Sequence, residues 1–576
     1  MHLVDSLGLQ SGRIAPVCCL HEQAAAIAAE AYAQYTQDLA VALVTTGPGG
    51  LNALTGVAGA WIDSTPVMIL SGQVKRNDRI GTRGVRQMGV QEVDIIPIAS
   101  PITKYAATVT DPRTVRYHLE KAAHLALHGR PGPVWLEFPL DVQGATIEEA
   151  GLPGFDPSEF PSPEASADLE GLVARAIALL NGARRPAILA GNGIRLAKAV
   201  PEFLELTGRL GIPVLTTWKA IDLLAEDDPL YFGRPGTVAS RGANFIQQNS
   251  DWILTLGARL DLPQTAHDPS HFAPGANKVV VDVDPAEIGK LPAVPDVPAA
   301  ADAKAFLAEF LRQADRVRAV DRTPWLDRCR RWKSAYPVIL PEYRAGKGPV
   351  NPYALIDVLS DLLRGDDLLV PGCSGACAEI TMQAFRVKRG QRIQNTPGLG
   401  SMGFGLPAGI GACLAGGGRR TVGIIGDGGL QHNIQELQTL ARLDLPVKIF
   451  ILNNNGYGSI RATQSRHFEG RLVCCDPSSG LTLPDTCNVA AAYGLRTFRI
   501  QDQGRLEEQV RAALEAEGPT VCEVRMDPDT PTAPRVASEV RPDGSIVSRP
   551  MEDLWPFLDR DEFETNMAVE PPEEQR

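Results

Sequence analysis

Two apolar runs in the C-terminal half of the chain each end in a short series of glycine, aspartate or asparagine residues. Residues 421–425 are followed by Gly426-Asp427-Gly428-Gly429, and a second apolar run by Asn453-Asn454-Asn455-Gly456. A helical segment lies between them, so the sequence predicts a strand–helix–strand unit with two adjacent parallel strands. Side chains at the carboxyl ends of such strands meet at the edge of the sheet where ligands bind.

The residue types at these two strand ends suit a bound cation and a phosphate group. An Asp carboxylate, an Asn amide oxygen and nearby backbone carbonyls are hard ligands for Mg²⁺, which usually keeps part of its shell for phosphate oxygens. The glycines let backbone N–H groups approach those oxygens closely. A lone Gly-Asp-Gly would favour two ordinary strand ends with turn residues, but the full spacing favours a cofactor site.

Composition indicates an ordinary globular protein of several domains. The 576 residues favour about three or four domains, and the fractions of hydrophobic (44%) and charged (22%) residues are typical of globular chains. A net charge of −12 argues against a nucleic-acid surface. We find no bilayer-spanning segment and no secretory signal, and we interpret the ten scattered cysteines as reduced thiols of a cytoplasmic protein without zinc.

Three α/β blocks and a tail are expected along the chain. Apolar strand-like runs alternate with helical stretches in each block, which favours parallel sheets. A Pro-rich linker at 153–163 follows the first block. A strand in the second block ends in Asp282-Val283-Asp284-Pro285, a pattern that resembles the ribose-binding edge of a dinucleotide fold. The predicted units are residues 1–150, 165–325, 351–526 and a tail at 527–576, of which Trp555 to Leu558 should dock on the body.

Taken together, these features resemble thiamine diphosphate (ThDP)-dependent enzymes, and within them the acetolactate synthase (acetohydroxyacid synthase large subunit) branch. The resemblance covers nearly the whole chain. Besides the Gly-Asp-Gly and Asn-Asn segment, it rests on His21-Glu22-Gln23-Ala24, Thr46-Gly47-Pro48-Gly49, Gln91-Glu92-Val93-Asp94-Ile95, Ile102-Thr103-Lys104 and Gly398-Leu-Gly-Ser-Met402-Gly-Phe-Gly-Leu-Pro407.

The resemblance implies an Mg²⁺ ion that bridges the cofactor diphosphate to the protein. Asp427 and Asn454 would bind it through their side chains, and Gly456 through its carbonyl. Met402 would support the bent cofactor, although it could also be a gap-filling core methionine. Further residues expected at the cofactor are Gly47, Pro48, Gly49, Ser374, Gly426, Gly428, Gly429 and Tyr457.

Glu22 is the expected catalytic carboxyl group. It should lie at a junction between a strand formed by residues 17–20 and an Ala-rich helix. Taken alone, a glutamate in a first helical turn is explained by the helix dipole. A ThDP enzyme, however, needs one carboxyl group hydrogen-bonded to the aminopyrimidine ring, and Glu22 matches that position. Gln91 and Lys104 match residues that line the substrate channel in relatives, although either could be a surface polar residue.

The family fold implied by this resemblance is α/β, with three doubly wound parallel-sheet domains. The first binds the pyrimidine of the cofactor, the second is the middle domain, and the third binds the diphosphate. Its active site forms between subunits, so the resemblance implies at least a dimer in which Glu22 and Asp427 act in trans. In this branch the middle domain binds FAD, which would contact Arg259 and Asp282 here. Related enzymes keep the fold without flavin.

Three departures from the family pattern stand out. The first domain is expected to lack its first strand, because its Met1 to Leu7 segment matches a later part of relatives. Thr463 occupies the position of a Trp that selects the second 2-oxo acid in acetohydroxyacid synthases, which argues against branched-chain amino-acid synthesis. The Gly-Gln-His loop of the family reads Gly372-Cys373-Ser374-Gly375-Ala376. The variant Asn455-Gly-Tyr-Gly-Ser-Ile-Arg461, together with the tail motif Leu554-Trp-Pro-Phe-Leu558, is closer to acetolactate synthase-like relatives associated with polysaccharide and deoxysugar pathways.

We therefore predict decarboxylation of a 2-oxo acid, most simply pyruvate, followed by ligation to an acceptor carbonyl. Alternatives are a carboligase that adds an acetyl unit to a sugar ketone, a simple decarboxylase, and a C–C lyase. A degenerate scaffold would lack Glu22, Asp427 or Asn454, and all three are present. A plain NAD-dependent dehydrogenase would need a clean GxGxxG motif after a strand, and the middle block has none. The acceptor and the choice of dimer or tetramer remain open.

Overall fold

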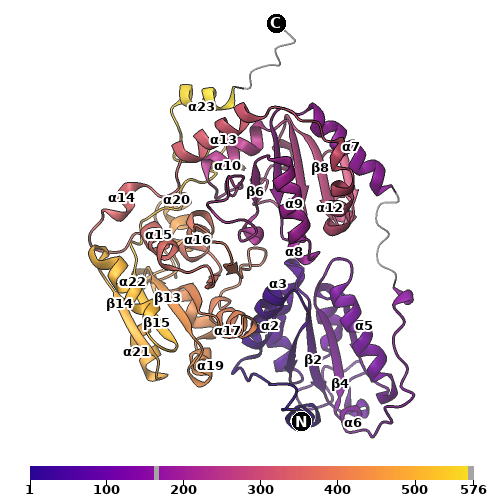
Figure 1. Cartoon of the computed structure of the whole chain (residues 1–576). Helices are drawn as coiled ribbons and strands as arrows, with labels where there is room; N and C mark the ends of the chain where they lie inside the picture. Colours follow the sequence, from indigo (N-terminus) through magenta and orange to yellow (C-terminus); the bar gives the residue numbers. More distant parts are fainter. Residues whose placement is uncertain (161–167, 569–576) are drawn as a thin grey trace.

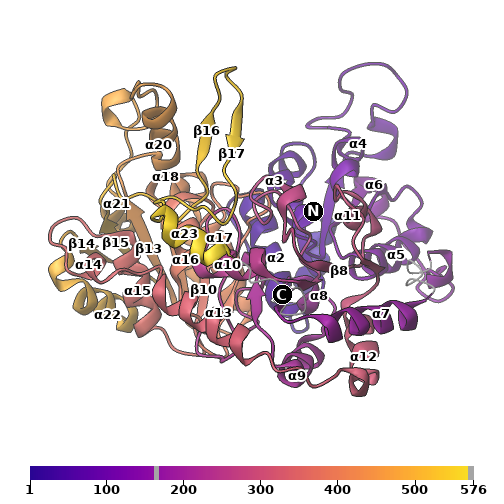
Figure 2. The ribbon, with the colours of Figure 1, turned by 90° about the horizontal axis from the view of Figure 1, so that it is seen from above.

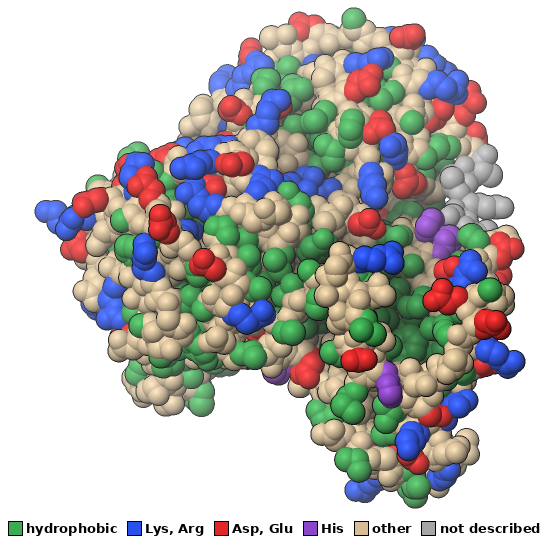
Figure 3. Space-filling view, turned by 60° about the horizontal axis from the view of Figure 1, so that its bottom comes forward, with side chains coloured by type: hydrophobic (Ala, Val, Ile, Leu, Met, Phe, Trp, Pro, Cys, Tyr) green, Lys and Arg blue, Asp and Glu red, His purple; other side chains and the backbone are tan. Residues whose placement is uncertain are grey.

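The computed structural model describes residues 1–160 and 168–568, which form three α/β blocks (Figure 1). Each block contains one sheet in which all paired strands are parallel, so the predicted fold of three parallel-sheet units is confirmed. On the face that Figure 3 shows, basic and acidic side chains are interspersed rather than gathered in one continuous patch. Within the described ranges, no helix combines the length and apolar character that a bilayer crossing requires.

The first block has a sheet of order β1-β2-β4-β3. Trp135 is fully buried within it and donates a hydrogen bond to Ser71 Oγ (2.9 Å). The strands are β1 (Ala40–Val44), β2 (Val67–Gln73), β3 (Tyr105–Thr108) and β4 (Val134–Pro139). The helices are α1 (His2–Leu9), α2 (Glu22–Thr36), α3 (Pro48–Ile62), α4 (Ile95–Ala99), α5 (Val115–Leu127) and α6 (Leu140–Gln143).

The strand expected at residues 17–20 does not form. These residues have no regular secondary structure, and Val17 and Leu20 are 41% and 60% exposed. An apolar run becomes a strand only when a neighbouring strand can satisfy its backbone groups. In this chain the sheet has β1 at its edge, and no described residue pairs with this segment as a strand.

The middle block has a sheet of order β6-β5-β7-β8-β9. Its central strands β5 and β7 are buried on both faces, which explains their continuous apolar sequences. They are β5 (Pro186–Ala190), β6 (Val214–Thr216), β7 (Trp252–Leu256), β8 (Asn277–Asp282) and β9 (Val297–Ala300). The helices are α7 (Leu169–Gly182), α8 (Gly193–Leu196), α9 (Val200–Leu210), α10 (Arg241–Asn249), α11 (Pro285–Gly289), α12 (Ala303–Arg312) and α13 (Thr323–Ala335). Short helix α14 (Pro341–Arg344) leads to the third block.

The third block has a sheet of order β11-β10-β12-β13-β15-β14. Its strands are β10 (Leu368–Pro371), β11 (Arg392–Ile393), β12 (Thr421–Gly426), β13 (Val447–Asn453), β14 (Arg496–Ile500) and β15 (Thr520–Arg525). The helices are α15 (Pro352–Leu362), α16 (Glu379–Ala384), α17 (Gly405–Ala415), α18 (Asp427–Leu430), α19 (Glu436–Leu443), α20 (Gly458–His467), α21 (Thr486–Ala492) and α22 (Leu506–Glu515). The strand–helix–strand unit predicted around Gly426 is therefore present.

Helices α2 and α17 join the first and third blocks and lie side by side in Figure 1. Ile27 and Ala31 on α2 pack with Phe404, Ala408 and Ala412 at and along α17. The two backbones approach closely, because a Cβ atom added at Gly411 would overlap the carbonyl oxygen of Ala28. Small residues along both helices thus allow this contact.

The C-terminal segment from residue 527 to residue 568 packs on the middle block. Arg241 in α10 donates hydrogen bonds to the carbonyls of Leu554 (3.0 Å) and Pro556 (2.6 Å), so the predicted docking of the apolar motif is confirmed. Helix α23 (Arg560–Met567) lies beside α13 (Figure 1), where Trp332 Nε1 donates to Asn566 Oδ1 (2.7 Å). Strands β16 (Ser538–Val540) and β17 (Ile546–Ser548) form a hairpin that projects from the body (Figure 2).

Candidate active site

Strands β12 and β13 pair in parallel, with Gly426 opposite Leu452, so their carboxyl ends lie at one edge of the third sheet. Asp427 directly follows β12 and begins α18, while Asn454 directly follows β13. The two ends are in contact, because the backbone N–H of Gly456 donates to Asp427 Oδ2 (3.0 Å). The sequence predicts this meeting of strand ends, and the structure shows it.

A buried carboxylate and a buried amide oxygen without a hydrogen-bond partner lie at this edge. Asp427 is only 4% exposed, and burial raises the pKa of its carboxyl group to about 6 against opposing hydrogen bonds from nearby N–H groups. Asn454 Oδ1 is buried and accepts no hydrogen bond from the described residues. A buried acceptor without a partner is costly, and a buried carboxylate favours a positive neighbour. The donor set therefore fits a hard divalent cation.

Gly428, Tyr457 and Met402 come together beside this carboxylate. A Cβ atom at Gly428 would overlap the ring of Tyr457 and would lie 3.7 Å from Met402 Cε. Glycine is therefore required at position 428 by close packing of the side chains around it. Gly426 and Gly429 differ, because a Cβ atom there would make only ordinary contacts, at 3.9 Å and 3.8 Å.

Glu22 lies at the start of α2, and its N-cap residue His21 accepts a hydrogen bond from Gln23 N–H through Nδ1 (3.1 Å). Asn52 Nδ2 donates to Glu22 Oε2 (3.1 Å), and a Cβ atom at Gly49 would lie 3.2 Å from Glu22 Oε1. Gly49 belongs to the Gly47-Pro48-Gly49 turn that begins α3. The structure thus brings Glu22 to the turn that sequence reasoning grouped with it.

Gln91 and Lys104 occupy different surroundings. Gly47, with φ of +54°, packs against the carbonyl of Gln91, whose own side chain is exposed. Lys104 Nζ donates to the carbonyl of His128 (2.6 Å), and burial lowers the pKa of Lys104 to about 8. Neither side chain hydrogen-bonds to Glu22 within the described residues.

Glu436 is a site residue that sequence reasoning missed. It begins α19 and is fully buried, and its Oε1 accepts hydrogen bonds from the backbone N–H groups of Leu20 and His21 (both 3.0 Å). Its Oε2 accepts from Thr439 Oγ1 (2.6 Å). A carboxylate of the third block therefore fixes the start of the helix that carries Glu22. Its sequence context is that of an ordinary acidic helix start, which gives no signal of this long-range contact.

A cavity of about 660 Å³ lies where the three blocks meet. Arg259 and Asp282 line it from the middle block, and Ser374 lines it from the third. Arg259 donates to the carbonyl of Ile62 (2.9 Å) and pairs with Asp261. Burial raises the pKa of Asp282 above its usual value. Gly193 and Gly257, in the same wall, approach each other so closely that added Cβ atoms would overlap the facing backbone.

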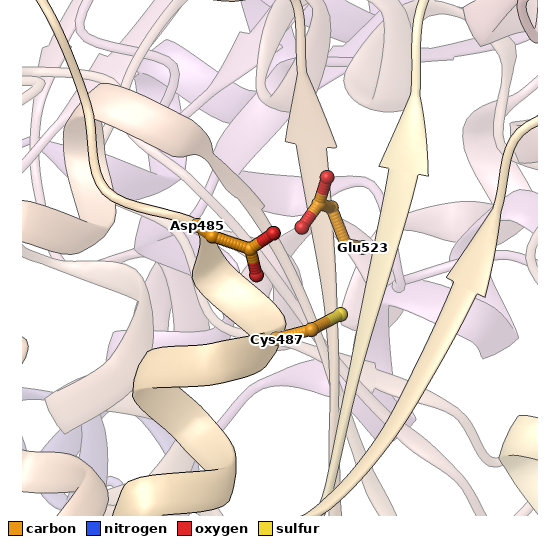
Figure 4. A group of neighbouring side chains, drawn as sticks. All are labelled: Asp485, Cys487 and Glu523. Atoms are coloured by element: carbon orange, nitrogen blue, oxygen red, sulfur yellow. The ribbon is translucent and has the colours of Figure 1, made fainter.

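Asp485, Cys487 and Glu523 form a second group with metal-ligand atoms close together (Figure 4). The Arg499 guanidinium already neutralises the two carboxylates, since its Nη2 lies 2.6 Å from Asp485 Oδ2 and 3.5 Å from Glu523 Oε2. Glu523 Oε1 also accepts from Asn453 Nδ2 (3.0 Å), one residue before Asn454. We interpret the group as a support for the Asn453–Gly456 turn rather than as a metal site.

Comparison with known proteins assigns the whole chain to one family. Three models of thiamine pyrophosphate enzymes match successive segments, the N-terminal TPP-binding domain at residues 1–98, the central domain at 173–310 and the C-terminal TPP-binding domain at 374–524.

Curated relatives extend the match over most of the chain. The acetolactate synthase large subunit of Parasynechococcus marenigrum is 34% identical over 91% of this chain and 82% of its own length. The acetolactate synthase large subunit of Cyanidium caldarium is 33% identical over 87% of this chain and 84% of its own length. The acetolactate synthase isozyme 1 large subunit of Escherichia coli is 32% identical over 92% of this chain and 90% of its own length. The chain therefore belongs to the thiamine diphosphate-dependent enzymes and is an acetolactate synthase-like member of that family.

Proposed function

We propose that this enzyme decarboxylates pyruvate or a close 2-oxo acid with ThDP and Mg²⁺ and ligates the remaining unit to an acceptor carbonyl. The family assignment supports ThDP-dependent decarboxylation and carboligation of 2-oxo acids. The observation that carries the proposal for this chain is the meeting of Asp427 with the Asn454–Gly456 turn at the carboxyl edge of the third sheet.

The metal would be held by Asp427, by Asn454 Oδ1 and by the carbonyl of Gly456. Support comes from the buried Asp427 carboxylate and from the unsatisfied Asn454 Oδ1. Backbone N–H groups of Gly426 and Gly429 would bind the diphosphate at the short helix α18. The Gly428 N–H instead donates to Asp427 Oδ1 (2.8 Å), so Gly428 would contribute by its small size. The packing of Met402 and Tyr457 against Gly428 makes them the apolar side of the same site.

Glu22 would hold the proton that the reaction moves at the pyrimidine ring. Asn52 binds Oε2, so Oε1 remains available to share a proton with the ring nitrogen. Glu436 keeps the beginning of α2 in place and thereby orients Glu22. When bound, ThDP supplies the electron sink for the pair released as carbon dioxide leaves. Gln91 and Lys104 would contribute at the substrate channel.

FAD is the proposed occupant of the cavity between the blocks. The cavity has Gly193 and Gly257 at the carboxyl edge of the middle sheet, where a dinucleotide phosphate binds in such folds. Asp282, at the end of β8, would accept a hydrogen bond from a ribose hydroxyl, and Arg259 and Ser374 also line the cavity. The cavity volume of about 660 Å³ is of the size that a dinucleotide needs.

We further propose a homo-oligomer, at least a dimer, in which Glu22 of one copy serves the Asp427 site of its partner. Glu22 is only half-buried in the single chain. Its own helix α2 exposes Tyr32 (40%), and α3 exposes Leu51 (41%) and Trp61 (39%). Apolar side chains exposed around a catalytic group are better explained by a covering partner than by solvent.

A sugar ketone is the second candidate acceptor. Thr463 is exposed on α20, where it donates a hydrogen bond to the carbonyl of Ser459 (3.0 Å), and it is smaller and more polar than the Trp expected at this position. Arg461, on the same helix, contacts the carbonyls of Asn454 and Pro528 (both 3.3 Å), so it braces the turn. A polar and open approach of this kind suits a larger polar acceptor.

The test is incubation with ThDP, Mg²⁺, FAD and carbon-13-labelled pyruvate, with products followed by NMR. Labelled acetolactate would support the proposal with pyruvate as both donor and acceptor. Labelled acetaldehyde alone would call for a panel of sugar ketones, and a ligated product there would identify the second candidate. Absence of consumption with pyruvate and a panel of 2-oxo acids would refute the proposal.

A further inference from the structure

The C-terminal segment places an arginine, Arg535, in the wall of the cavity between the blocks. Its backbone N–H donates to the carbonyl of Trp555 (2.9 Å), and Trp555 N–H donates back to Arg535 (2.7 Å). The next residue, Val536, donates to the carbonyl of Thr237 (2.8 Å). Main-chain bonds on both sides thus position Arg535 independently of its side-chain charge.

The guanidinium of Arg535 has no hydrogen-bond partner among the described residues. Its Nε is buried and unsatisfied, and Glu379 Oε2 lies 4.0 Å from Nη1, beyond hydrogen-bonding distance. Arg130, in the wall of the same cavity, differs because its guanidinium lies 2.9 Å from Asp284 and 2.7 Å from Glu287. The Arg535 side chain keeps 35% of its surface exposed, so its donors remain accessible to a ligand.

Arg535 lies beside the side of the cavity that the third block forms, since its Nη1 is 4.0 Å from Glu379 Oε2. Glu379 and Met382 of α16 line this part, together with Cys373 and Ser374 from the loop that follows β10. Strand β10 pairs with β12, so this loop shares the carboxyl edge that carries Asp427. The glycines proposed for the dinucleotide belong instead to the middle sheet.

Glu379 lies within ion-pairing range of Arg535, but the guanidinium donors make no hydrogen bond to it. A partly desolvated arginine with unused donors favours an oxyanion ligand, which it binds through paired hydrogen bonds. A substrate carboxylate and a dinucleotide phosphate share this chemistry, and the location beside the third sheet favours the substrate. We propose that Arg535 binds the carboxylate of the 2-oxo acid and so determines substrate specificity. This inference rests on the proposed function, from which its test is separable.

The test compares Arg535→Gln with the wild type, using pyruvate as the probe. We expect the KM for pyruvate to rise about tenfold to a hundredfold, because a charge-assisted hydrogen-bond pair is lost. Arg535→Lys keeps the charge without the planar fork and should fall between the two. FAD affinity, measured by fluorescence titration, and melting temperature should not change. Arg541→Gln is the matched control, since Arg541 is exposed in the hairpin of the same segment.

An unchanged KM for pyruvate in Arg535→Gln would overturn the proposal. Weaker FAD binding with an unchanged KM would also overturn it, and would assign Arg535 to the dinucleotide. Calorimetric titration of pyruvate into the holoenzyme in the Glu22→Gln background makes the test independent of turnover. Pyruvate binding in Glu22→Gln that is lost in the double variant with Arg535→Gln would support the proposal. This result would hold even if the wild type formed no ligated product and the proposed reaction were wrong.

Discussion

At the scale of single residues, the site depends on oxygen and nitrogen atoms that the folded chain leaves without partners. Asn454 Oδ1 and Arg535 Nε are both buried and have no hydrogen-bond partner among the described residues. Most buried polar groups in proteins are paired, so each such atom requires a reason. The two proposals supply a common reason, because a cation would pair with Asn454 Oδ1 and an anion with the Arg535 guanidinium.

Replacement of Glu22 should separate catalysis from cofactor binding. Glu22→Gln keeps the hydrogen bond from Asn52 but cannot exchange a proton, so we expect turnover to fall by roughly 10²–10⁴-fold. Deuterium exchange at the C2 position of bound ThDP should slow in parallel, while ThDP affinity remains within about twofold. Glu149→Gln, at an exposed position of the same block, is the control. Full turnover in Glu22→Gln would show that another residue carries the proton.

Replacement of Asp427 should have the opposite pattern. Asp427→Ala removes the proposed metal ligand and the acceptor for the Gly456 N–H group. The affinity of the protein for ThDP and Mg²⁺ should therefore fall. The measurement is the rise in melting temperature on addition of both ligands, which reports binding to the folded state. We expect the rise to be lost in Asp427→Ala and retained in Asp444→Asn, an exposed control in a left-handed turn. An equal rise in both variants would exclude Asp427 as the metal ligand.

At the scale of elements, helix α17 illustrates how a sequence determines a joint. The motif around Met402 predicts cofactor contact, but it says nothing of the spacing between α17 and α2. That spacing follows from Gly411, whose missing side chain lets the carbonyl of Ala28 approach. Two glycines two positions apart in one helix have different surroundings, because Gly409 faces Val447 at an ordinary 3.5 Å.

This contrast predicts different effects of alanine at the two positions. Gly411→Ala should destabilise the protein by about 1–3 kcal/mol, because the added methyl group forces α2 away from α17. Gly409→Ala should be neutral or stabilising by up to about 1 kcal/mol, because alanine favours helix and space is available. Melting temperatures of the two variants check this, and similar losses in both would contradict the close contact at Gly411.

The difference between local motifs and long-range contacts determines how far the sequence predicts the fold and the site. Apolar runs that end in glycine predict the parallel strands, and local motifs predict that Asp427 meets the turn after β13. The strand expected at residues 17–20 fails because pairing is a long-range property that an apolar run does not encode. Glu436, Glu523 and Arg535 were missed for the same reason, since each acts on a segment distant in sequence.

At the scale of the whole molecule, the three blocks meet around a buried group of charges. Glu30 of α2 is 1% exposed and accepts a hydrogen bond from Gln34 Nε2 (2.9 Å). Nearby, Lys219 of the middle block lies 3.3 Å from Asp63 of the first and also donates to the carbonyl of Asn395 in the third. Burial raises the pKa of Glu30 from 4.5 to about 8; Asp63 adds to the rise, while Lys219 and Gln34 oppose it.

This shift makes stability depend on pH through the junction of the blocks. Because the folded-state pKa of Glu30 exceeds its unfolded value, the stabilisation is fully present below about pH 4.5 and is lost as pH rises through about 8. Glu30→Gln keeps the shape and the hydrogen-bonding group without titrating. Relative to the wild type, its melting temperature should therefore fall less between pH 5 and pH 8, and it should be the more stable protein at pH 8.

Melting curves of both proteins across that range provide the measurement, with Glu517→Gln as the exposed control. Each unit of pKa difference corresponds to about 1.4 kcal/mol, so the separation at pH 8 should amount to a few kcal/mol at most. Parallel pH profiles for wild type and Glu30→Gln would mean that Glu30 stays charged in the folded protein. Lys219 would then neutralise it across the joint, and Lys219→Met should destabilise the protein at pH 8 more than at pH 5.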